Sequence, residues 1–232
     1  MSDIVVVTGF DREAAVVKQL GVRTVAGGGD AAGLAKALES AVAGALGIIS
    51  FGLTGALVDG LAIGDWVIGD RIAGTVNLAC DPAWRDALAA RLPEARVGGF
   101  FADGRMIDTV AEKRALGLKH NALAVDMESH VAAETAARNG LPFAILRCVS
   151  DRVDHLLPHA VTVCMRPDGR MDVAAMLGSL ARQPAQLPDF IRTMTGFASA
   201  FRALHRGNRA VGIRLGFPGT VPTGDCPLTA AL

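Results

Sequence analysis

The chain has 232 residues, of which 51% are hydrophobic, and its 23 basic residues are balanced by 23 acidic ones. This length suits one large α/β domain with a sizeable core. The absence of net charge removes the electrostatic case for binding nucleic acid or an anionic membrane surface. Tyrosine is absent and aromatic residues make up only 5%, which disfavours a stacking platform for single-stranded nucleic acid.

The cysteine pattern and the N-terminal segment bear on where the protein resides. The four cysteines, Cys80, Cys148, Cys164 and Cys226, have no C-x-x-C spacing, so we expect reduced thiols. The segment MSDIVVVTGF has no basic region and enters a strand almost at once, which does not fit a signal peptide. No apolar run is long enough to span a bilayer. These features predict a cytoplasmic protein without stable membrane insertion.

Strands and helices alternate along the first two thirds of the chain. Apolar runs predict strands at 4–7, 22–26, 47–51, within 60–72, at 97–101, 122–125 and 142–149. Between them, helices are predicted at 11–20, 31–43, 81–92, 109–118 and 131–137. This alternation favours a mixed, mostly parallel central sheet with helices on both faces.

Beyond residue 151 the alternation weakens. Residues 152–170 contain proline and histidine and predict a loop or lid, while 173–181 and 190–205 predict helices. From residue 212 the chain is rich in glycine and proline, which indicates irregular structure. We therefore expect a single α/β domain over 1–232. It has a core at about 1–160, a C-terminal helical extension at about 170–210 and an irregular tail at 212–232.

Acidic residues stand at the ends of two apolar strands in ALAVDMESHVAAETAARNGLPFAILRCVSD, residues 122–151. Asp126 and Glu128 follow the first strand, and Asp151 ends the second. Ligands bind beyond the carboxyl ends of parallel strands, so Glu128 and Asp151 should meet at one edge of the sheet. Single carboxylates at such places also serve as helix caps or turn residues. Two of them in one βαβ unit favour a functional site.

The pattern VDMES, followed about twenty residues later by PFAILRCVSD, resembles the nucleoside phosphorylase and nucleosidase superfamily over roughly residues 4 to 155. The resemblance implies a three-layer αβα fold and a purine nucleoside substrate. It implies that Glu128 holds the ribose hydroxyls, with Met127 packed on the sugar, and that Asp151 protonates the purine. It also implies further substrate-binding residues: Gly9, Thr54, Gly55, Met106, Asp126 and Ser150.

The segment TGFDRE, residues 8–13, bears on the nucleophile. Glu13 alone would be a first-turn carboxylate stabilised by the helix dipole. In the nucleosidase branch a Glu at this place positions the attacking water, and in the phosphorylase branch an Arg nearby helps to hold phosphate, a role open to Arg12. A phosphorylase would need a basic cluster, such as Arg12, Arg23 and Arg71, near the sugar C1′. Water and phosphate both stay open at this point.

Two segments depart from the pattern of the family. FGLTGAL, residues 51–57, resembles the family turn T-G-x-A-G-G-L, with Phe51 in place of a small polar residue and Leu53 in place of Ser or Val. In FADGRM, residues 101–106, Arg105 replaces the usual aromatic residue, which leaves base stacking there open. Arg147 lies in the middle of a predicted strand, where it either pairs with an acidic residue or serves the site.

Two further motifs carry weaker signals. Residues 27–32 fit G-x-G-x-x-A, but they follow the second strand and no acidic residue ends the next one, so a tight turn or close backbone approach is favoured over a dinucleotide site. His155 and His159 flank Pro158, with Cys164 nearby, but no second pair of ligands exists. We therefore expect solvated loop histidines and no metal site.

Cleavage of an N-glycosidic bond requires a proton for the leaving purine and stabilisation of a cationic sugar. Asp151 would donate the proton as a general acid, a type of help worth about 10²–10⁴-fold. Glu128 would favour the oxocarbenium charge, and Glu13 would align and deprotonate the water. This chemistry needs no metal or organic cofactor, and inorganic phosphate would be a co-substrate only in a phosphorylase.

Taken together, TGFDREA, FGLTGAL, VDMESH and RCVSD most resemble the hopanoid-associated branch, which is linked to the removal of adenine from adenosylhopane. We therefore expect an N-glycosidase for an adenine nucleoside with an apolar 5′ substituent, and Phe51, Leu53 and the C-terminal helices would line its channel. The alternatives are a phosphate-dependent purine nucleoside phosphorylase, a methylthioadenosine or adenosylhomocysteine nucleosidase, and a non-catalytic nucleoside-binding module. The family usually forms dimers or larger assemblies, so we expect a homo-oligomer. A lipid-linked substrate leaves peripheral membrane contact open.

Overall fold

The computed structural model describes residues 3–18, 21–164 and 172–219. Eight strands occupy β1 (Ile4–Thr8), β2 (Val22–Ala26), β3 (Gly47–Ala56), β4 (Trp66–Gly74), β5 (Leu78–Ala79), β6 (Arg96–Ala102), β7 (Ala122–Asp126) and β8 (Phe143–Asp151). The helices are α1 (Asp11–Val16), α2 (Ala31–Ala41), α3 (Pro82–Arg91), α4 (Val110–His120), α5 (Ser129–Arg138), α6 (His159–Thr162), α7 (Val173–Arg182) and α8 (Leu187–Val211). Short 3₁₀ turns lie at Pro184–Gln186 and Ile213–Gly216.

The strands form one mixed sheet in the order β2-β1-β3-β7-β6-β4-β5, and β8 pairs with both β3 and β4. Pairs β1–β2, β1–β3, β3–β8, β4–β6 and β6–β7 are parallel, while β3–β7, β4–β5 and β4–β8 are antiparallel. The predicted mixed, mostly parallel sheet is confirmed. Its closure into a ring through β3, β7, β6, β4 and β8 was not predicted. This closure places the ends of β7 and β8 on either side of β3.

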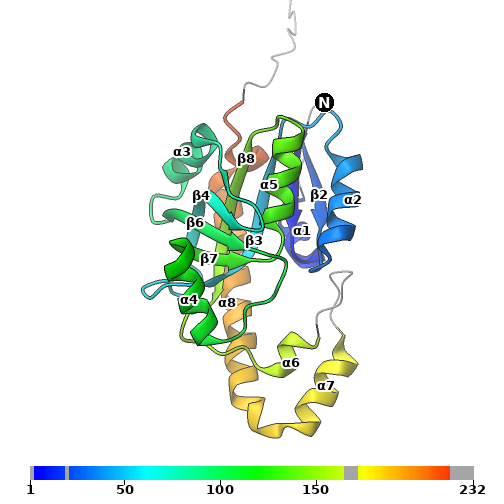
Figure 1. Ribbon diagram of the computed structural model, residues 1–232, viewed down its shortest axis with the longest axis vertical. Helices are drawn as coiled ribbons and strands as arrows, with labels where there is room; N and C mark the ends of the chain where they lie inside the picture. Colours follow the sequence, from blue (N-terminus) through cyan, green and yellow to red (C-terminus); the bar gives the residue numbers. More distant parts are fainter. Residues whose placement is uncertain (1–2, 19–20, 165–171, 220–232) are drawn as a thin grey trace, which may run out of the picture.

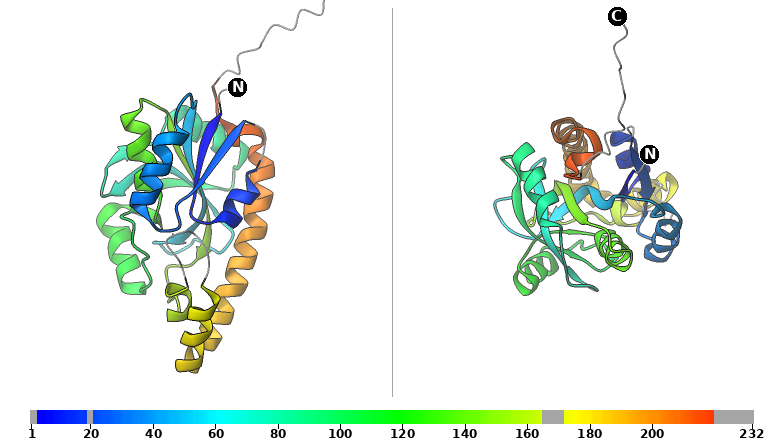
Figure 2. Two further views of the ribbon diagram at one scale, coloured as in Figure 1. Left: turned by 90° about the vertical axis from the view of Figure 1, so that its right-hand side faces the viewer. Right: turned by 90° about the horizontal axis from the view of Figure 1, so that it is seen from above.

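Helices cover the sheet in layers (Figures 1 and 2). On one face, α2 and α5 pack their apolar residues, among them Leu34, Leu38 and Val131, against the strands. On the other face, α3 and α8 pack against the strands through residues such as Trp84 and Leu204. The structure thus has the predicted architecture of a sheet between helices with a C-terminal helical extension.

Strand β3 is longer than predicted. The sequence indicated an end at Phe51, but the strand continues through Gly52, Leu53 and Thr54 to Ala56. Gly52 has φ +150°, and a Cβ there would lie 2.7 Å from the carboxylate of Glu13. The glycines that seemed to mark a turn therefore give room beside an extended chain for a side chain from another element.

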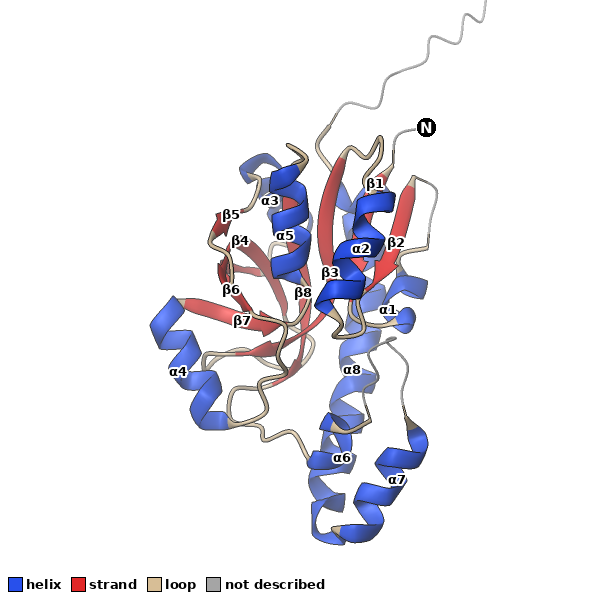
Figure 3. Cartoon of the chain, turned by 45° about the vertical axis from the view of Figure 1, so that its right-hand side comes forward, coloured by secondary structure: helices blue, strands red, loops and turns tan. Residues whose placement is uncertain are grey.

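The helical extension forms an arm that stands away from the sheet. Helices α6, α7 and the first half of α8 make up this arm (Figures 1 and 3), and α6 lies within the segment predicted as a loop or lid. The rest of α8 runs back along the sheet, so it is longer than predicted, and α1 ends at Val16, earlier than predicted. Within the described ranges no helix is long and apolar enough to cross a membrane. Most of the predicted irregular tail, with Cys226, lies outside the described residues.

Candidate active site

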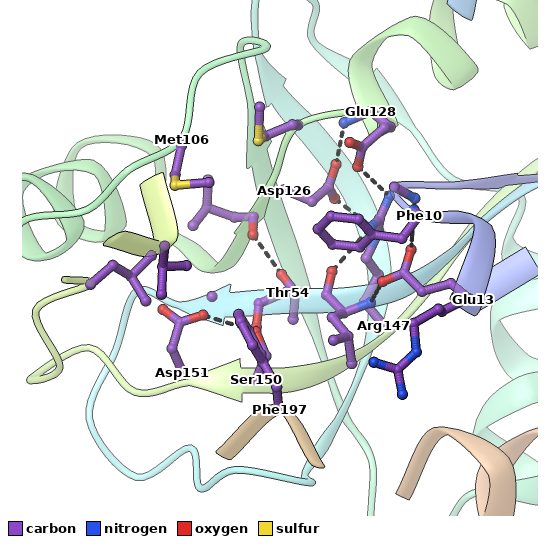
Figure 4. A pocket seen from close by; sticks show the side chains of 18 of the residues that line it. Phe10, Glu13, Thr54, Met106, Asp126, Glu128, Arg147, Ser150, Asp151 and Phe197 are labelled. Atoms are coloured by element: carbon purple, nitrogen blue, oxygen red, sulfur yellow. Dashed lines mark hydrogen bonds and ion pairs between the residues drawn. The ribbon is translucent and has the colours of Figure 1, made fainter. Parts of the chain in front are cut away.

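One cavity of about 530 Å³ lies beyond the carboxyl ends of β1, β3, β7 and β8 (Figure 4). It brings together every site residue predicted from the sequence: Gly9, Glu13, Thr54, Gly55, Met106, Asp126, Met127, Glu128, Ser150 and Asp151. These residues come from five separate segments. The predicted meeting of strand ends at one edge therefore occurs, although which of these side chains touch a substrate stays a prediction.

Glu13 is held by backbone amides at the buried end of the cavity. Its Oε2 accepts hydrogen bonds from the N–H groups of Gly9 at 2.7 Å and Phe10 at 3.0 Å, and its Oε1 accepts one from Leu53 at 2.8 Å. Burial raises the pKa of Glu13, although Arg147 and the three amides oppose this effect. A fixed carboxylate whose proton affinity is raised can accept a proton from water.

Arg147, which the sequence left between two roles, is the buried cation of the site. Its Nη2 donates to Glu128 Oε2 at 3.2 Å and to Ser50 Oγ at 2.7 Å, and its Nη1 donates to the carbonyl of Leu53 at 3.0 Å. Its Nε lies 3.3 Å from Asp126 Oδ2. Burial lowers the pKa of Arg147, but the surrounding carboxylates outweigh it, so the net pKa lies above the ordinary value. Arg147 therefore pairs with acidic side chains and also lines the cavity.

Glu128 begins α5 with its carboxylate buried beside Arg147. Burial raises the pKa of Glu128 to about 7; Arg147 opposes this, and Asp126 and Glu13 add to it. A Cβ at Gly9 would lie 3.3 Å from both the Glu128 Oε1 and the Glu13 Oε2 atoms. The two carboxylates therefore flank the backbone at Gly9.

The glycine run at 27–29 packs against the side chains of Glu128 and Met127. A Cβ at Gly27 would lie 2.8 Å from Glu128 Cγ, and one at Gly29, where φ is +80°, would lie 2.9 Å from Met127 Cε. The run is therefore a tight turn that lets the backbone approach the site residues closely. It makes room for Glu128 and Met127.

Asp126 holds the turn into α5. Its Oδ1 accepts from the N–H groups of Glu128 at 2.9 Å and Ser129 at 2.7 Å, and its Oδ2 accepts from Ser129 Oγ at 2.6 Å. These contacts and the nearby Arg147 engage both carboxylate oxygens. The geometry therefore gives Asp126 a positioning role, and direct contact with a substrate stays a prediction.

Asp151 lies at the other end of the cavity and has a partner that sequence reasoning missed. Its Oδ1 accepts from Ser150 Oγ at 2.9 Å, and its Oδ2 accepts from Lys113 Nζ of α4 at 2.5 Å. The Lys113 side chain is 0% exposed. No local signal could have found this pair, because the helical pattern of α4 gives no reason to bury a lysine.

The arm supplies an apolar wall to the same cavity. The lining residues from the loop after β8, α6 and α8 are Leu157, Val161, Cys164, Met194, Phe197, Ala198 and Phe201. Leu53 also lines the cavity, as expected, whereas Phe51 is fully buried against Trp66, with ring centroids 6.0 Å apart. The predicted place of Phe51 in the channel is therefore wrong, because Phe51 lies two residues farther from the carboxyl end of β3 than Leu53 and packs within the apolar core.

The basic residues considered for phosphate do not converge. Arg12 lines the cavity and stacks on Phe201 at 4.8 Å. Arg23 instead donates to the carbonyl of Ala41, and Arg71 donates to that of Asn121. The cluster that a phosphorylase was expected to need is thus absent from the described part of the chain.

Two further residues considered in the sequence, Arg105 and His155, lie close to this site. Arg105 lines the cavity but is tied to Asp103 at 2.8 Å and to Glu112 at 3.1 Å. His155 was expected to be a solvated loop residue, which is wrong, because it is buried behind the Lys113–Asp151 pair.

By sequence, His159 and the cysteines are also possible metal ligands or thiols. His159 is exposed, and its Nδ1 lies 3.0 Å from Ser179 Oγ. No group of three or more His, Cys, Asp or Glu side chains in the described ranges is placed to hold a metal ion. The three described cysteines, Cys80, Cys148 and Cys164, are free.

Comparison with known proteins places the chain in a family. A model of the phosphorylase superfamily matches residues 21–182, a span that leaves out β1 and Glu13. No curated protein sequence matches the chain. Helicobacter pylori 5′-methylthioadenosine/S-adenosyl homocysteine nucleosidase has a similar fold, with a TM-score of 0.65 at 12% identity over 92% of this chain and 97% of that one.

Two further solved structures share the fold. The 5′-methylthioadenosine/S-adenosylhomocysteine nucleosidase of S. pneumoniae has a TM-score of 0.60 at 17% identity, over 90% of this chain and 99% of that one. Futalosine hydrolase of Helicobacter pylori has a TM-score of 0.59 at 14% identity, over 78% and 98%. The resemblance to the superfamily is confirmed, and with it the prediction of an enzyme of the nucleosidase or nucleoside phosphorylase kind, whereas the hopanoid-associated branch stays a prediction. The chain belongs to the phosphorylase superfamily.

Proposed function

We propose that this enzyme hydrolyses the N-glycosidic bond of an adenine nucleoside with an apolar 5′ substituent. The observation that carries the proposal is the arrangement of one cavity (Figure 4), with Glu13 and Glu128 at one end, Asp151 at the other and an apolar wall alongside. A nucleoside needs these three environments for its sugar, base and 5′ group.

Each proposed step moves a defined proton or electron pair. Asp151 gives its proton to purine N7, and the C1′–N9 bond breaks with its electron pair moving to the purine. Glu128 stabilises the cationic sugar as a fixed anion in a buried site. A water molecule attacks C1′ and gives a proton to Glu13. The products are adenine and the free sugar, and no cofactor takes part.

Water fits the charges of this cavity better than phosphate does. The Nη atoms of Arg147 donate to Glu128, Ser50 and Leu53, and its Nε lies 3.3 Å from Asp126 Oδ2 without a hydrogen bond. Among the residues that the structure describes, a phosphate at C1′ would therefore face buried carboxylates, and the cation left to approach it would be Arg12. This balance favours hydrolysis over phosphorolysis.

The apolar wall supports the choice of 5′ group. Phe197, Phe201 and Met194 of α8 line the cavity together with Leu157 and Val161, and burial of such surface is worth about 25 cal/mol per Å². A hydrocarbon as large as the hopane of adenosylhopane would use this wall most fully. The methylthio group of the substrates named for the similar nucleosidases is the second candidate, because the same wall would also cover a small thioether.

The test is adenine release from two nucleosides, methylthioadenosine and an adenosine with a long apolar 5′ group, each with and without phosphate. We expect release without phosphate from both, with the higher kcat/KM for the long group. The matched control is Asp151→Asn, which should lose about 10²–10⁴-fold in kcat. Release only with phosphate would refute hydrolysis. Efficient release from methylthioadenosine alone would refute the long apolar group.

A further inference from the structure

Lys113 occupies a place that a lysine rarely occupies, because its ammonium is wholly removed from water. Nζ donates to Asp151 Oδ2 at 2.5 Å, to the carbonyl of Arg152 at 3.1 Å and to the carbonyl of His155 at 3.0 Å. These three contacts use all three N–H bonds of the ammonium. Burial of a charge is costly unless it is paired and hydrogen-bonded, and here both conditions are met.

The location of this pair separates it from an ordinary structural ion pair. Asp151 reaches the cavity from the end of β8, whereas Lys113 approaches from α4, outside the lining of the cavity. The lysine therefore contacts the far side of the carboxylate. Ser150 Oγ fixes the other oxygen at 2.9 Å, so the plane of the carboxylate is set from two directions.

We propose that Lys113 is the positioning residue and fixed counter-ion of the general acid, an inference that rests on the proposed function. When Asp151 gives its proton to purine N7, the C1′–N9 electron pair moves to the purine and a carboxylate remains. That carboxylate forms 2.5 Å from an ammonium already in place, so no solvent has to reorganise around it. Lys113 keeps its own proton throughout and acts only through Asp151.

The other titratable groups near the pair, among the residues that the structure describes, include one histidine and an arginine–aspartate pair. His155 follows β8 and is buried beside it, and burial lowers the pKa of His155 despite the opposing effect of Asp151. Arg192 and Asp189 of α8 also act on His155 and lie 4.0 Å from each other. Because His155 favours its neutral form, Lys113 is the cation in direct contact with the acid in the described part of the chain.

The experiment measures the pH dependence of adenine release by wild type, Lys113→Met and Lys113→Arg, with Lys119→Met on the exposed side of α4 as the matched control. Without the cation the protonated acid persists to higher pH. We expect Lys113→Met to move the alkaline limb of kcat upward by about 1–3 pH units, the size of a contact charge effect. We also expect kcat to fall at least about tenfold with KM little changed, because the carboxylate left by proton transfer loses its counter-ion.

Lys113→Arg retains the charge, so its alkaline limb should stay near that of wild type even if kcat falls, which a purely structural role would not produce. If Lys113→Met does not fold, Lys113→Gln takes its place, and the limb of Lys113→Gln is compared with that of Lys113→Arg. Equal limbs in the neutral and charged variants would overturn the inference. Failure of wild type to release adenine from any nucleoside would instead overturn the proposed function.

Discussion

Replacement of Arg147 by methionine would test how the buried carboxylates are held. Methionine keeps most of the apolar stem but removes the guanidinium that contacts Glu128 and Asp126 and lies near Glu13. Removal of one partner from a buried ion pair typically costs about 3–5 kcal/mol, since the other charge stays buried without compensation. For a domain of this size each kcal/mol lowers Tm by about 2–4 °C, so the expected loss at pH 8 is about 6–20 °C.

The loss should depend on pH in a defined direction. Burial raises the pKa of Glu13, and that of Glu128 to about 7, and both rise further without Arg147. A raised carboxyl pKa costs nothing below the unfolded value near 4.5, and its cost grows as pH rises from the unfolded to the folded value and then stays constant. Thermal unfolding followed by circular dichroism should therefore show a smaller loss at pH 5 than at pH 8.

A matched variant separates this effect from any loss of arginine. Arg114→Met removes a cation that pairs with Asp59 on an exposed surface, and it should leave Tm unchanged within error. An Arg147→Met loss of equal size at pH 5 and pH 8 would refute the electrostatic account. The substitution would then act through lost packing alone.

Three further outcomes are expected. Gly52→Ala should lower kcat at least about tenfold, because the added Cβ would lie 2.7 Å from Glu13. The control is Gly44→Ala, also at positive φ but in open space, which should leave activity unchanged. Steady-state kinetics of both variants test this prediction. Phe197→Ala should raise KM for a long apolar 5′ group more than for a methylthio group, measured on paired substrates. Since the pKa of Glu128 is raised to about 7, wild-type kcat/KM should fall as pH drops below about 7 and the anion takes up a proton; a flat profile there would contradict its role.

The site was predictable where its geometry is local. Asp126, Glu128 and Asp151 lie in one βαβ unit, so the spacing along the chain fixes which sheet edge they share. That rule predicted that Glu128 and Asp151 meet, and the family resemblance implied the site residues of the other segments. Glu13 depended on the family resemblance, since a carboxylate in a first helical turn has an ordinary explanation.

The features that were missed depend on contacts between distant elements. The predicted end of β3 at Phe51 was wrong because a glycine, Gly52, follows and glycine disfavours a strand. In the structure, Glu13 of α1 fills the space that a side chain at Gly52 would occupy. Lys113 and His155 are buried because the loop after β8 folds over α4. Phe51 lies in the core because β3 continues beyond it and stays paired with β8 as far as Gly55. None of these contacts leaves a trace in local residue patterns.

Strand β3 also fixes the distance between Glu13 and Asp151. The N–H of Leu53 binds Glu13, and the backbone at Gly55 packs against Asp151, where a Cβ would lie 3.0 Å from Oδ2. Two residues of extended chain span about 7 Å. The separation of Glu13 and Asp151, the proposed base and acid, is therefore set by covalent bonds within one strand. A one-residue insertion between these positions would turn one of the two contact points to the opposite face of the sheet, whereas the arm that lines the cavity can change without altering that spacing.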